Sequence, residues 1–263
     1  MIQLALVILL PAVSWATTYH PLQQYGLKLR FVDVELDTLN IDTTQLQAAL
    51  TPKTKAIVAV SILGNPAALD IMRAFADAHG LTMLEDNCES LDAELNGQKT
   101  GTFGDIGTFS FFFSHHISTG EGGMLITDDA ELDALARAVR AHGWIRDIPD
   151  GLDLFEEGED SFAEAYRFVI PGYNLRPQEF NGAAGLEQLK KLPAMTERRR
   201  ANLALFQDAF GDDERFMIQR ENGKSSSFCF PMIVKPDCGL ERADVFGPLE
   251  GAPIGFRMIT GGN

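Results

Sequence analysis

The sequence predicts an α/β fold with a mostly parallel central sheet flanked by helices. Short apolar runs rich in Val, Ile and Leu alternate with helical patterns over the first half of the chain. These runs lack the polar alternation of half-exposed strands, which is typical of parallel strands covered on both faces. Gly, Pro, Asp or Asn follows most of the runs, as expected where strands and helices end.

Composition sets the broad class. The chain has 263 residues, of which 45% are hydrophobic and 22% charged, as in globular proteins. A net charge of −15 argues against nucleic-acid binding, which needs a basic surface. Three scattered cysteines provide no disulfide framework, so a reducing cytoplasm is expected. The apolar start, 1–10, lacks a basic flank and is too short to span a bilayer, which favours a buried strand.

The elements follow in order. We expect a short helix ending at Gly26, a helix to Leu50 capped by Thr43 or Thr44, and a helix capped by Asp128 or Asp129. An acidic exposed loop is expected over 147–161. The remaining expected strands are 29–34, 56–60, 81–86, 106–112 and 124–127, and the other helices are 67–79, 131–141, 178–191 and 193–210, with the arginines of 198–200 on a solvated face.

The regular alternation of strands and helices ends after the sixth expected strand. Strand-like pieces such as 228–234 and Gly/Pro-rich sequence follow the last long helix. We therefore expect a large domain over 1–192 and the beginning of a smaller α+β domain over 193–263.

The chemistry-bearing residues gather at expected strand ends. Asp86 closes an apolar run, with Glu89 three residues on, and His115-His116 follow the run that ends near Phe113. In open α/β sheets the ligand crevice lies at the carboxyl ends of strands. Asp86 could pair with a ligand cation or simply cap a turn. One histidine could act as a general acid or base, because imidazole titrates near neutral pH.

Other interpretations stay open on the residues alone. His115, His116 and Glu121 could bind zinc or iron, but adjacent residues rarely enter one coordination sphere, so we expect no metal. The Ser110 hydroxyl either forms a hydrogen bond with its own backbone or binds a phosphate. Trp15 belongs to the core or stacks on a flat ligand. Arg146 and Arg176 are surface cations or clamps for carboxylate or phosphate.

Five motifs resemble those of the pyridoxal-phosphate-dependent nucleotide-sugar aminotransferases and dehydratases of fold type I. In that family a lysine near the position of His115 holds the cofactor as a Schiff base, and histidine there is similar to the sugar 3-dehydratase branch. The motifs are Glu85-Asp-Asn-Cys-Glu-Ser90, Gly101-Thr-Phe-Gly-Asp-Ile-Gly-Thr-Phe-Ser110, Gly120-Glu-Gly-Gly-Met124, Arg140-Ala-His-Gly143 and Gly172-Tyr-Asn-Leu-Arg176. The resemblance extends from Pro11 to about Val234.

The resemblance implies a role for each residue. His115 would be the catalytic acid and base. The cofactor, pyridoxal or pyridoxamine 5′-phosphate held without a covalent bond, would contact Trp15 (stacking), Asp86 (ring nitrogen), Glu89 (near the ring hydroxyl) and Ser110 (phosphate). The substrate would contact His142, Arg146 and Arg176. L-glutamate would be the amino donor and a nucleotide-linked 4-keto-6-deoxy sugar the substrate, in a homodimer that makes deoxysugars for surface polysaccharide.

The same resemblance includes a long region before Pro11, with a loop that cradles the cofactor phosphate, and this chain does not contain it. We therefore expect a chain shortened at both ends that binds cofactor weakly by itself. Two alternatives to the 3-dehydratase are an ordinary nucleotide-sugar aminotransferase, which the absent lysine disfavours, and an inactive truncated remnant.

Overall fold

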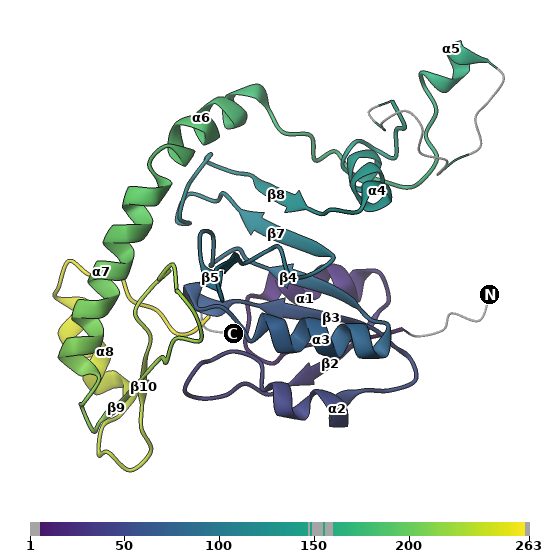
Figure 1. The fold of residues 1–263 in the computed structure, drawn as a ribbon. Helices are drawn as coiled ribbons and strands as arrows, with labels where there is room; N and C mark the ends of the chain where they lie inside the picture. Colours follow the sequence, from purple (N-terminus) through teal and green to yellow (C-terminus); the bar gives the residue numbers. More distant parts are fainter. Residues whose placement is uncertain (1–5, 147, 149–154, 156–159, 261–263) are drawn as a thin grey trace.

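A computed structural model describes residues 6–146, 148, 155 and 160–260. Six strands form the central sheet in the order β2-β1-β3-β4-β7-β8, parallel except for the last pair (Figure 1). This confirms the α/β class and the mostly parallel sheet. The strands are β1 (Val7–Pro11), β2 (Lys28–Val32), β3 (Thr54–Val60), β4 (Thr82–Asp86), β7 (Ile106–Ser110) and β8 (Gly123–Ile126).

Both faces of the sheet are covered, and the strands supply each face in alternation. In β3, Ile57 and Ala59 join the cluster that packs on α3 (Leu69–His79), which contributes Leu69, Met72 and Ala76. The intervening residues Ala56, Val58 and Val60 join a second cluster, against which Tyr19 and Leu22 of α1 (Ala16–Gln24) pack. Uninterrupted apolar runs are required because each face of these strands is buried.

Local signals explain several helix boundaries. Gly80 adopts φ +60° after α3, and its backbone N–H closes the last turn as a left-handed cap. Asp129 caps α4 (Ala130–Arg140) by accepting from the N–H groups of Glu131 and Leu132. Of the two aspartates expected as the cap, Asp128 and Asp129, it is therefore Asp129 that caps the helix.

Some expected elements are shorter or differently capped. The helix expected to begin at Thr43 or Thr44 is capped by Asp42, which accepts from Thr44 N–H, and it consists of a 3-10 turn followed by α2 (Leu46–Ala49). The strand expected over 106–112 ends at Ser110, because Ser110 Oγ accepts from Phe112 N–H and turns the chain. Most of the loop expected over 147–161 lies outside the described residues.

The rest of the chain forms an arm and a tail. The arm consists of the described residues of 141–177, between α4 and α6, and it includes α5 (Ser161–Glu164), which Figure 1 shows projecting with α4 beyond the edge strand β8. The tail contains α6 (Glu179–Leu189), α7 (Leu192–Phe210), α8 (Arg242–Glu250) and a hairpin of β9 (Phe216–Ile218) with β10 (Met232–Val234). A second small hairpin, β5 (Glu94–Leu95) with β6 (Gln98–Lys99), lies after β4. Within the described residues no helix has the length and apolarity to cross a membrane.

The tail packs on the large domain instead of standing apart from it. Ser225, Ser226 and Ser227 are buried, and the first two donate to the carbonyl of Gly64. A Cβ on Gly64 would lie 2.7 Å from Ser227 N, and its φ of +91° also favours glycine. Contacts therefore cross the expected boundary between 192 and 193, whose position stays a prediction.

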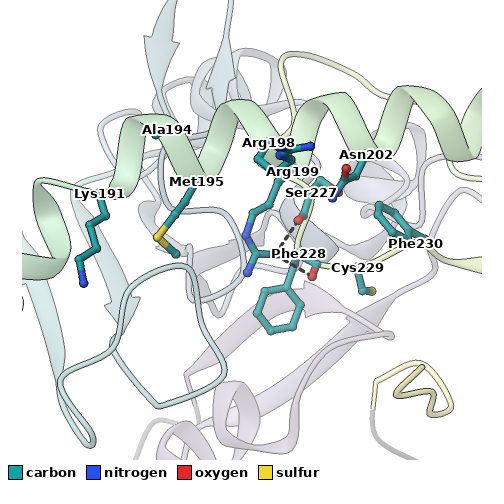
Figure 2. A pocket seen from close by; sticks show the side chains of 10 residues that line it. All are labelled: Lys191, Ala194, Met195, Arg198, Arg199, Asn202, Ser227, Phe228, Cys229 and Phe230. Carbon is teal, nitrogen blue, oxygen red and sulfur yellow. Dashed lines mark hydrogen bonds between the residues drawn. The ribbon is translucent and has the colours of Figure 1, made fainter. Parts of the chain in front are cut away.

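The arginines of 198–200 correct another expectation. Arg199 Nη1 donates to the carbonyls of Ser227 and Phe228 (Figure 2). Arg200 donates to the carbonyls of Ser225 and Asp92. Instead of lying on a solvated face, these two guanidinium groups join α7 to the 225–228 segment, because carbonyls left without partners there need donors.

Candidate active site

Parallel pairing brings the ends of β4 and β7 to one edge of the sheet. Asp86 pairs with Thr108 in register, so the last residue of β4 lies next to the end of β7, where Ser110 stands. Ligand crevices in open α/β sheets form at this edge. The sequence placed Asp86 at a strand end and Ser110 inside an expected strand, and the structure makes the ends of both strands neighbours.

The acidic pair at the end of β4 divides between two tasks because strand side chains alternate in direction. Glu85 is 1% exposed and accepts the N–H groups of Gly101, Phe103 and Gly104 at 2.6–2.7 Å. Burial raises its pKa, and those three N–H donors act in the opposite direction. Glu85 therefore holds a turn, which leaves Asp86 for the crevice.

Asp86 is oriented by two neighbours. Its Oδ2 accepts from the Thr18 hydroxyl of α1 at 2.7 Å, and its Oδ1 accepts from Cys88 N–H at 3.1 Å. Thr18 in turn lies 2.9 Å from Ser14 through their hydroxyl oxygens. The carboxylate thus has a fixed direction, which a partner for a ligand cation requires.

His115 lies at the same edge, and one hydrogen bond sets its tautomer. Its Nδ1 is 2.5 Å from the carbonyl oxygen of Cys88. A carbonyl can only accept, so Nδ1 carries the hydrogen and Nε2 carries the free lone pair. Burial lowers the pKa of His115, although the Cys88 carbonyl and the Asp86 charge act to raise it. A neutral imidazole with a free Nε2 is suited to accept a proton near pH 7.

His116 has a different environment from its neighbour. It is 1% exposed, and its Nε2 lies 3.1 Å from the carbonyl oxygen of Ser226. Burial, followed by the charge of Arg199, lowers its pKa to about 4. The two imidazoles therefore bind carbonyls on two different segments, and His116 joins its loop to the tail.

Phe228 connects the two histidines with the tail. Its ring centroid is 5.2 Å from that of His115 and 5.9 Å from that of His116. The N–H of Phe228 donates to the Leu63 carbonyl, which fixes the segment against the loop after β3. Apolar cover of this kind desolvates His115 on one side, which is the main cause of its lowered pKa.

Trp15 and Glu89 lie near the same edge of the sheet. Trp15 is 44% exposed, and the guanidinium carbon of Arg257 lies 5.7 Å from the centre of its ring system. Glu89 accepts from Leu63 N–H at 2.8 Å, and burial raises the pKa of its carboxyl. The charge of Arg257 acts on both Glu89 and His115, so this cation belongs to the site.

Two further groups in the crevice have limited roles. Burial raises the pKa of the Cys88 thiol far above neutral, so Cys88 stays protonated and is a poor nucleophile. Ser110 Oγ accepts from Phe112 N–H at 3.3 Å, and its hydroxyl hydrogen is available to a ligand oxygen. Ser110 thus makes the contact with its own backbone that the sequence offered as one alternative, and its role in binding a phosphate stays a prediction.

His142, Arg146 and Arg176 lie elsewhere, at the base of the arm. All three side chains are exposed, and Arg146 stacks over Trp144 at 5.1 Å. His142 has φ +66° and donates its backbone N–H to the Tyr173 carbonyl. In the part of the chain that the structure describes, no hydrogen bond, ion pair or ring contact joins any of the three to His115 or Asp86. Their role as substrate contacts stays a prediction.

Sequence reasoning missed four members of the site: Thr18, Phe228, Arg199 and Arg257. None stands in a motif at a strand end, and each reaches the crevice through tertiary contacts. Of these four, only Thr18 could have been found from the sequence. It lies three residues after Trp15, so in a helix that begins there the two side chains are neighbours. Over the described residues, no group of three or more His, Cys, Asp or Glu side chains is arranged to hold a metal ion.

Comparison with known families agrees with this geometry. Residues 4–260 match the model of the DegT/DnrJ/EryC1/StrS aminotransferase family. The chain belongs to this family. The motifs in the sequence resemble the family only as far as about Val234. The match to the family model continues beyond this residue and includes Arg257.

Two curated family members are similar over almost the whole chain. GDP-4-keto-6-deoxy-D-mannose 3-dehydratase of Yersinia pseudotuberculosis is 49% identical over 97% of this chain and 65% of its own length. The enzyme of that name from Escherichia coli O55:H7 is 48% identical over 97% of this chain and 66% of its own length. The chain therefore spans just under two thirds of the length of these relatives.

Solved family structures share the fold. A histidine-to-asparagine variant of GDP-4-keto-6-deoxymannose 3-dehydratase (ColD) with bound GDP-perosamine superposes with a TM-score of 0.91 at 47% identity, over 96% of this chain and 66% of that chain. The Escherichia coli enzyme with hydrated pyridoxal phosphate gives 0.92 at 46% identity, over 97% and 66%. A ColD variant in which an adjacent serine and histidine become asparagine and lysine gives 0.93, at 46% identity over 98% and 68%.

Proposed function

We propose that this chain carries the catalytic centre of a pyridoxal-phosphate-dependent sugar 3-dehydratase. The enzyme removes the 3-hydroxyl of a nucleotide-linked 4-keto-6-deoxy sugar, with L-glutamate as amino donor. The observation that supports this most is His115 with Nε2 free, at the position where the family resemblance has lysine. Ser114-His115 is the one Ser-His pair in the sequence, and an adjacent Ser-His pair was altered in the ColD variant.

The residues present fit pyridoxal phosphate. Asp86, oriented by Thr18 and Cys88, offers a carboxylate for a protonated ring nitrogen. Trp15 offers an exposed aromatic face, and Ser110 offers a hydroxyl for phosphate. When bound, the cofactor would supply an amine derived from glutamate and an electron sink for the carbon that His115 deprotonates, and hydrolysis after loss of the 3-hydroxyl as water would release that nitrogen as ammonia. Histidine has no primary amine, so the hold on the cofactor is non-covalent and falls to Asp86, Trp15 and Ser110.

His115 determines the reaction type in this proposal. With Nδ1 held by the Cys88 carbonyl, Nε2 accepts a proton at the reacting carbon and returns it to the departing 3-hydroxyl oxygen. Asp86 keeps the cofactor in place, and Phe228 excludes water from one side of the imidazole. A lysine would offer a second amine and favour transfer of nitrogen to the sugar.

Product analysis tests the function. Purified chain with pyridoxal phosphate, L-glutamate and GDP-4-keto-6-deoxy-mannose should yield a 3-deoxy sugar, detected by mass as loss of the 3-hydroxyl. A product that gains an amine would instead establish an aminotransferase, and absence of any product with cofactor bound would reject both. His115→Asn should lower turnover by roughly 10² to 10⁴, the usual contribution of an acid–base residue. His115→Lys should acquire a covalent cofactor adduct after borohydride reduction.

We also propose a homodimer, formed through the arm and α6. Eight large apolar side chains among the described residues there are exposed, a density that marks protein–protein contact. They are Phe162, Tyr166, Phe168, Tyr173, Leu175, Phe180, Leu186 and Leu189. A second copy covering this face would also bury the surroundings of His142, Arg146 and Arg176, as a substrate role for them requires.

A further inference from the structure

Two hydroxyl groups at the start of α1, those of Ser14 and Thr18, connect with Asp86. The two hydroxyl oxygens lie 2.9 Å apart, and Thr18 Oγ1 donates to Asp86 Oδ2 at 2.7 Å. We call Ser14 and Thr18 the hydroxyl pair. Ser14 is buried, so its hydroxyl depends on partners within the protein. The hydroxyl pair therefore belongs to the packed structure around Asp86 and not to its solvent shell.

The direction of the two hydrogen bonds follows from the acceptor at their end. A carboxylate has no hydrogen to donate, so the hydroxyl hydrogen of Thr18 points at Asp86. Thr18 has only this one hydroxyl hydrogen, and its oxygen must therefore accept from the Ser14 hydroxyl in the 2.9 Å contact. Both hydroxyls thus donate toward Asp86. Hydrogen bonds that point the same way strengthen one another, so Ser14 acts on the carboxylate through Thr18.

The turn that carries the hydroxyl pair is held from two sides. Tyr19, the residue after Thr18, donates its hydroxyl to the Pro11 carbonyl at 3.1 Å and packs against the second buried cluster. From the tail, the buried Thr260 donates to the Ser14 carbonyl at 2.8 Å. The sheet and the tail thus fix both ends of the turn. As a result, the Thr18 hydroxyl has a defined position relative to β4, the strand that ends at Asp86.

The contacts of Asp86 leave it able to bind a further donor. Thr18 occupies one position on Oδ2, and Cys88 N–H occupies one on Oδ1 at 3.1 Å, so each oxygen keeps a lone pair. We propose that Thr18 is a positioning residue for the cofactor: its hydroxyl, aligned by Ser14, holds the Asp86 carboxylate in one orientation toward the ring nitrogen. This inference rests on the proposed function for the cofactor and for the role of Asp86.

Absorbance titration with pyridoxal phosphate tests this role without turnover. Thr18→Val keeps the shape of the side chain and removes the hydroxyl, so it should weaken binding roughly three- to tenfold, the net effect of one hydrogen bond. Thr18→Ser restores a hydroxyl and should bind within about twofold of the unaltered chain. Thr17→Val is the matched control, because Thr17 is the adjacent residue and is exposed. Its affinity should also stay within about twofold.

The Asp86→Ala variant separates a role through the carboxylate from a packing role of Thr18. Once the carboxylate is gone, Thr18→Val should change the affinity for pyridoxal phosphate by less than about twofold, because residues that act through one another are not additive. Equal weakening by Thr18→Val with and without Asp86, or no weakening in the otherwise unaltered chain, would overturn the proposal. Ser14→Ala should weaken binding less than Thr18→Val does, and a larger loss would overturn the order of the hydroxyl pair.

The same titrations are independent of the reaction that the chain performs. Unaltered binding by Thr18→Val, in a chain that forms the 3-deoxy sugar, would reject the role of Thr18 alone. Weakened binding by Thr18→Val, in a chain that forms an aminated sugar, would reject the 3-dehydratase alone. A folded chain that binds no pyridoxal phosphate would overturn both.

Discussion

The carboxyl edge of the sheet and the arm differ in how their polar groups are held. At the sheet edge Asp86, Glu89 and His115 each have a backbone or side-chain partner from another element. On the arm, His142, Arg146 and Arg176 have exposed side chains, and the nearest ring contact is that of Arg146 with its neighbour Trp144. Contacts within the chain therefore orient the polar groups of the sheet edge, whereas the side chains of Arg146 and Arg176 on the arm are exposed.

The two regions also differ in burial of apolar surface. The strand ends lie on two clusters of fully buried side chains, which make their geometry rigid. The arm has a small aromatic group in which Trp144 stacks with Tyr166 and Phe168, all partly or largely exposed. Substitutions at the edge should therefore change binding and chemistry, and substitutions on the arm should change association while leaving folding intact.

The largest expected difference concerns the cofactor. Asp86→Asn keeps an acceptor for the Thr18 hydroxyl but removes the charge that would hold a protonated ring nitrogen. Affinity for pyridoxal phosphate should fall at least tenfold, because an opposite charge at close range contributes more than about 1.4 kcal/mol. Absorbance titration measures it, with Asp128→Asn at an exposed site as the control. An unchanged dissociation constant would refute the role of Asp86.

An intermediate effect is expected from acid. His116 has a pKa of about 4 when folded, against 6.5 for the free side chain, so the unfolded chain binds its proton first as pH falls. The contribution of His116 to the free energy of unfolding is therefore fully present above about pH 6.5 and decreases as the pH falls toward 4. Between pH 7.5 and pH 5 the free energy of unfolding should fall by about 2 kcal/mol. Urea unfolding at both values measures this. The His116→Asn variant can still donate a hydrogen bond to the Ser226 carbonyl, and its free energy of unfolding should depend less on pH. A pH dependence as steep as that of the unaltered chain would contradict this role of His116.

The smallest effect on folding is expected from the arm and from α6, which contains Phe180. Arg176→Ala and Phe180→Ser alter exposed side chains, so each should change the free energy of unfolding by less than about 0.5 kcal/mol. Phe180→Ser should nevertheless shift sedimentation toward the monomer, because it removes apolar surface from the proposed interface. Arg176→Ala serves as its control for association. A large loss of stability in either variant would show that the arm packs as a structural core does.

Much of the site could be predicted, because parallel strands impose a simple rule. Asp86 closes an apolar run, and parallel pairing brings the end of that strand next to the end of β7, although the sequence had placed Ser110 inside its strand and not at its end. The different environments of His115 and His116 could not be predicted from the residues next to them in the sequence. It depends on which carbonyl each imidazole meets, Cys88 for one and Ser226 for the other, and the second lies 110 positions away. Arg199 and Arg200 were misjudged for the same reason, since their carbonyl partners come from distant segments.

By itself the sequence determined the alternating strands and helices, an aspartate cap at position 128 or 129, and the histidine that stands where the family motif has lysine. These features depend on local chemistry: side-chain period, capping and residue identity. The tertiary structure decided the tautomer of His115, the burial of His116 and the return of the tail that brings Phe228 and Arg257 to the crevice. Burial and long-range hydrogen bonds set protonation and position, and they exist only once distant segments have packed together.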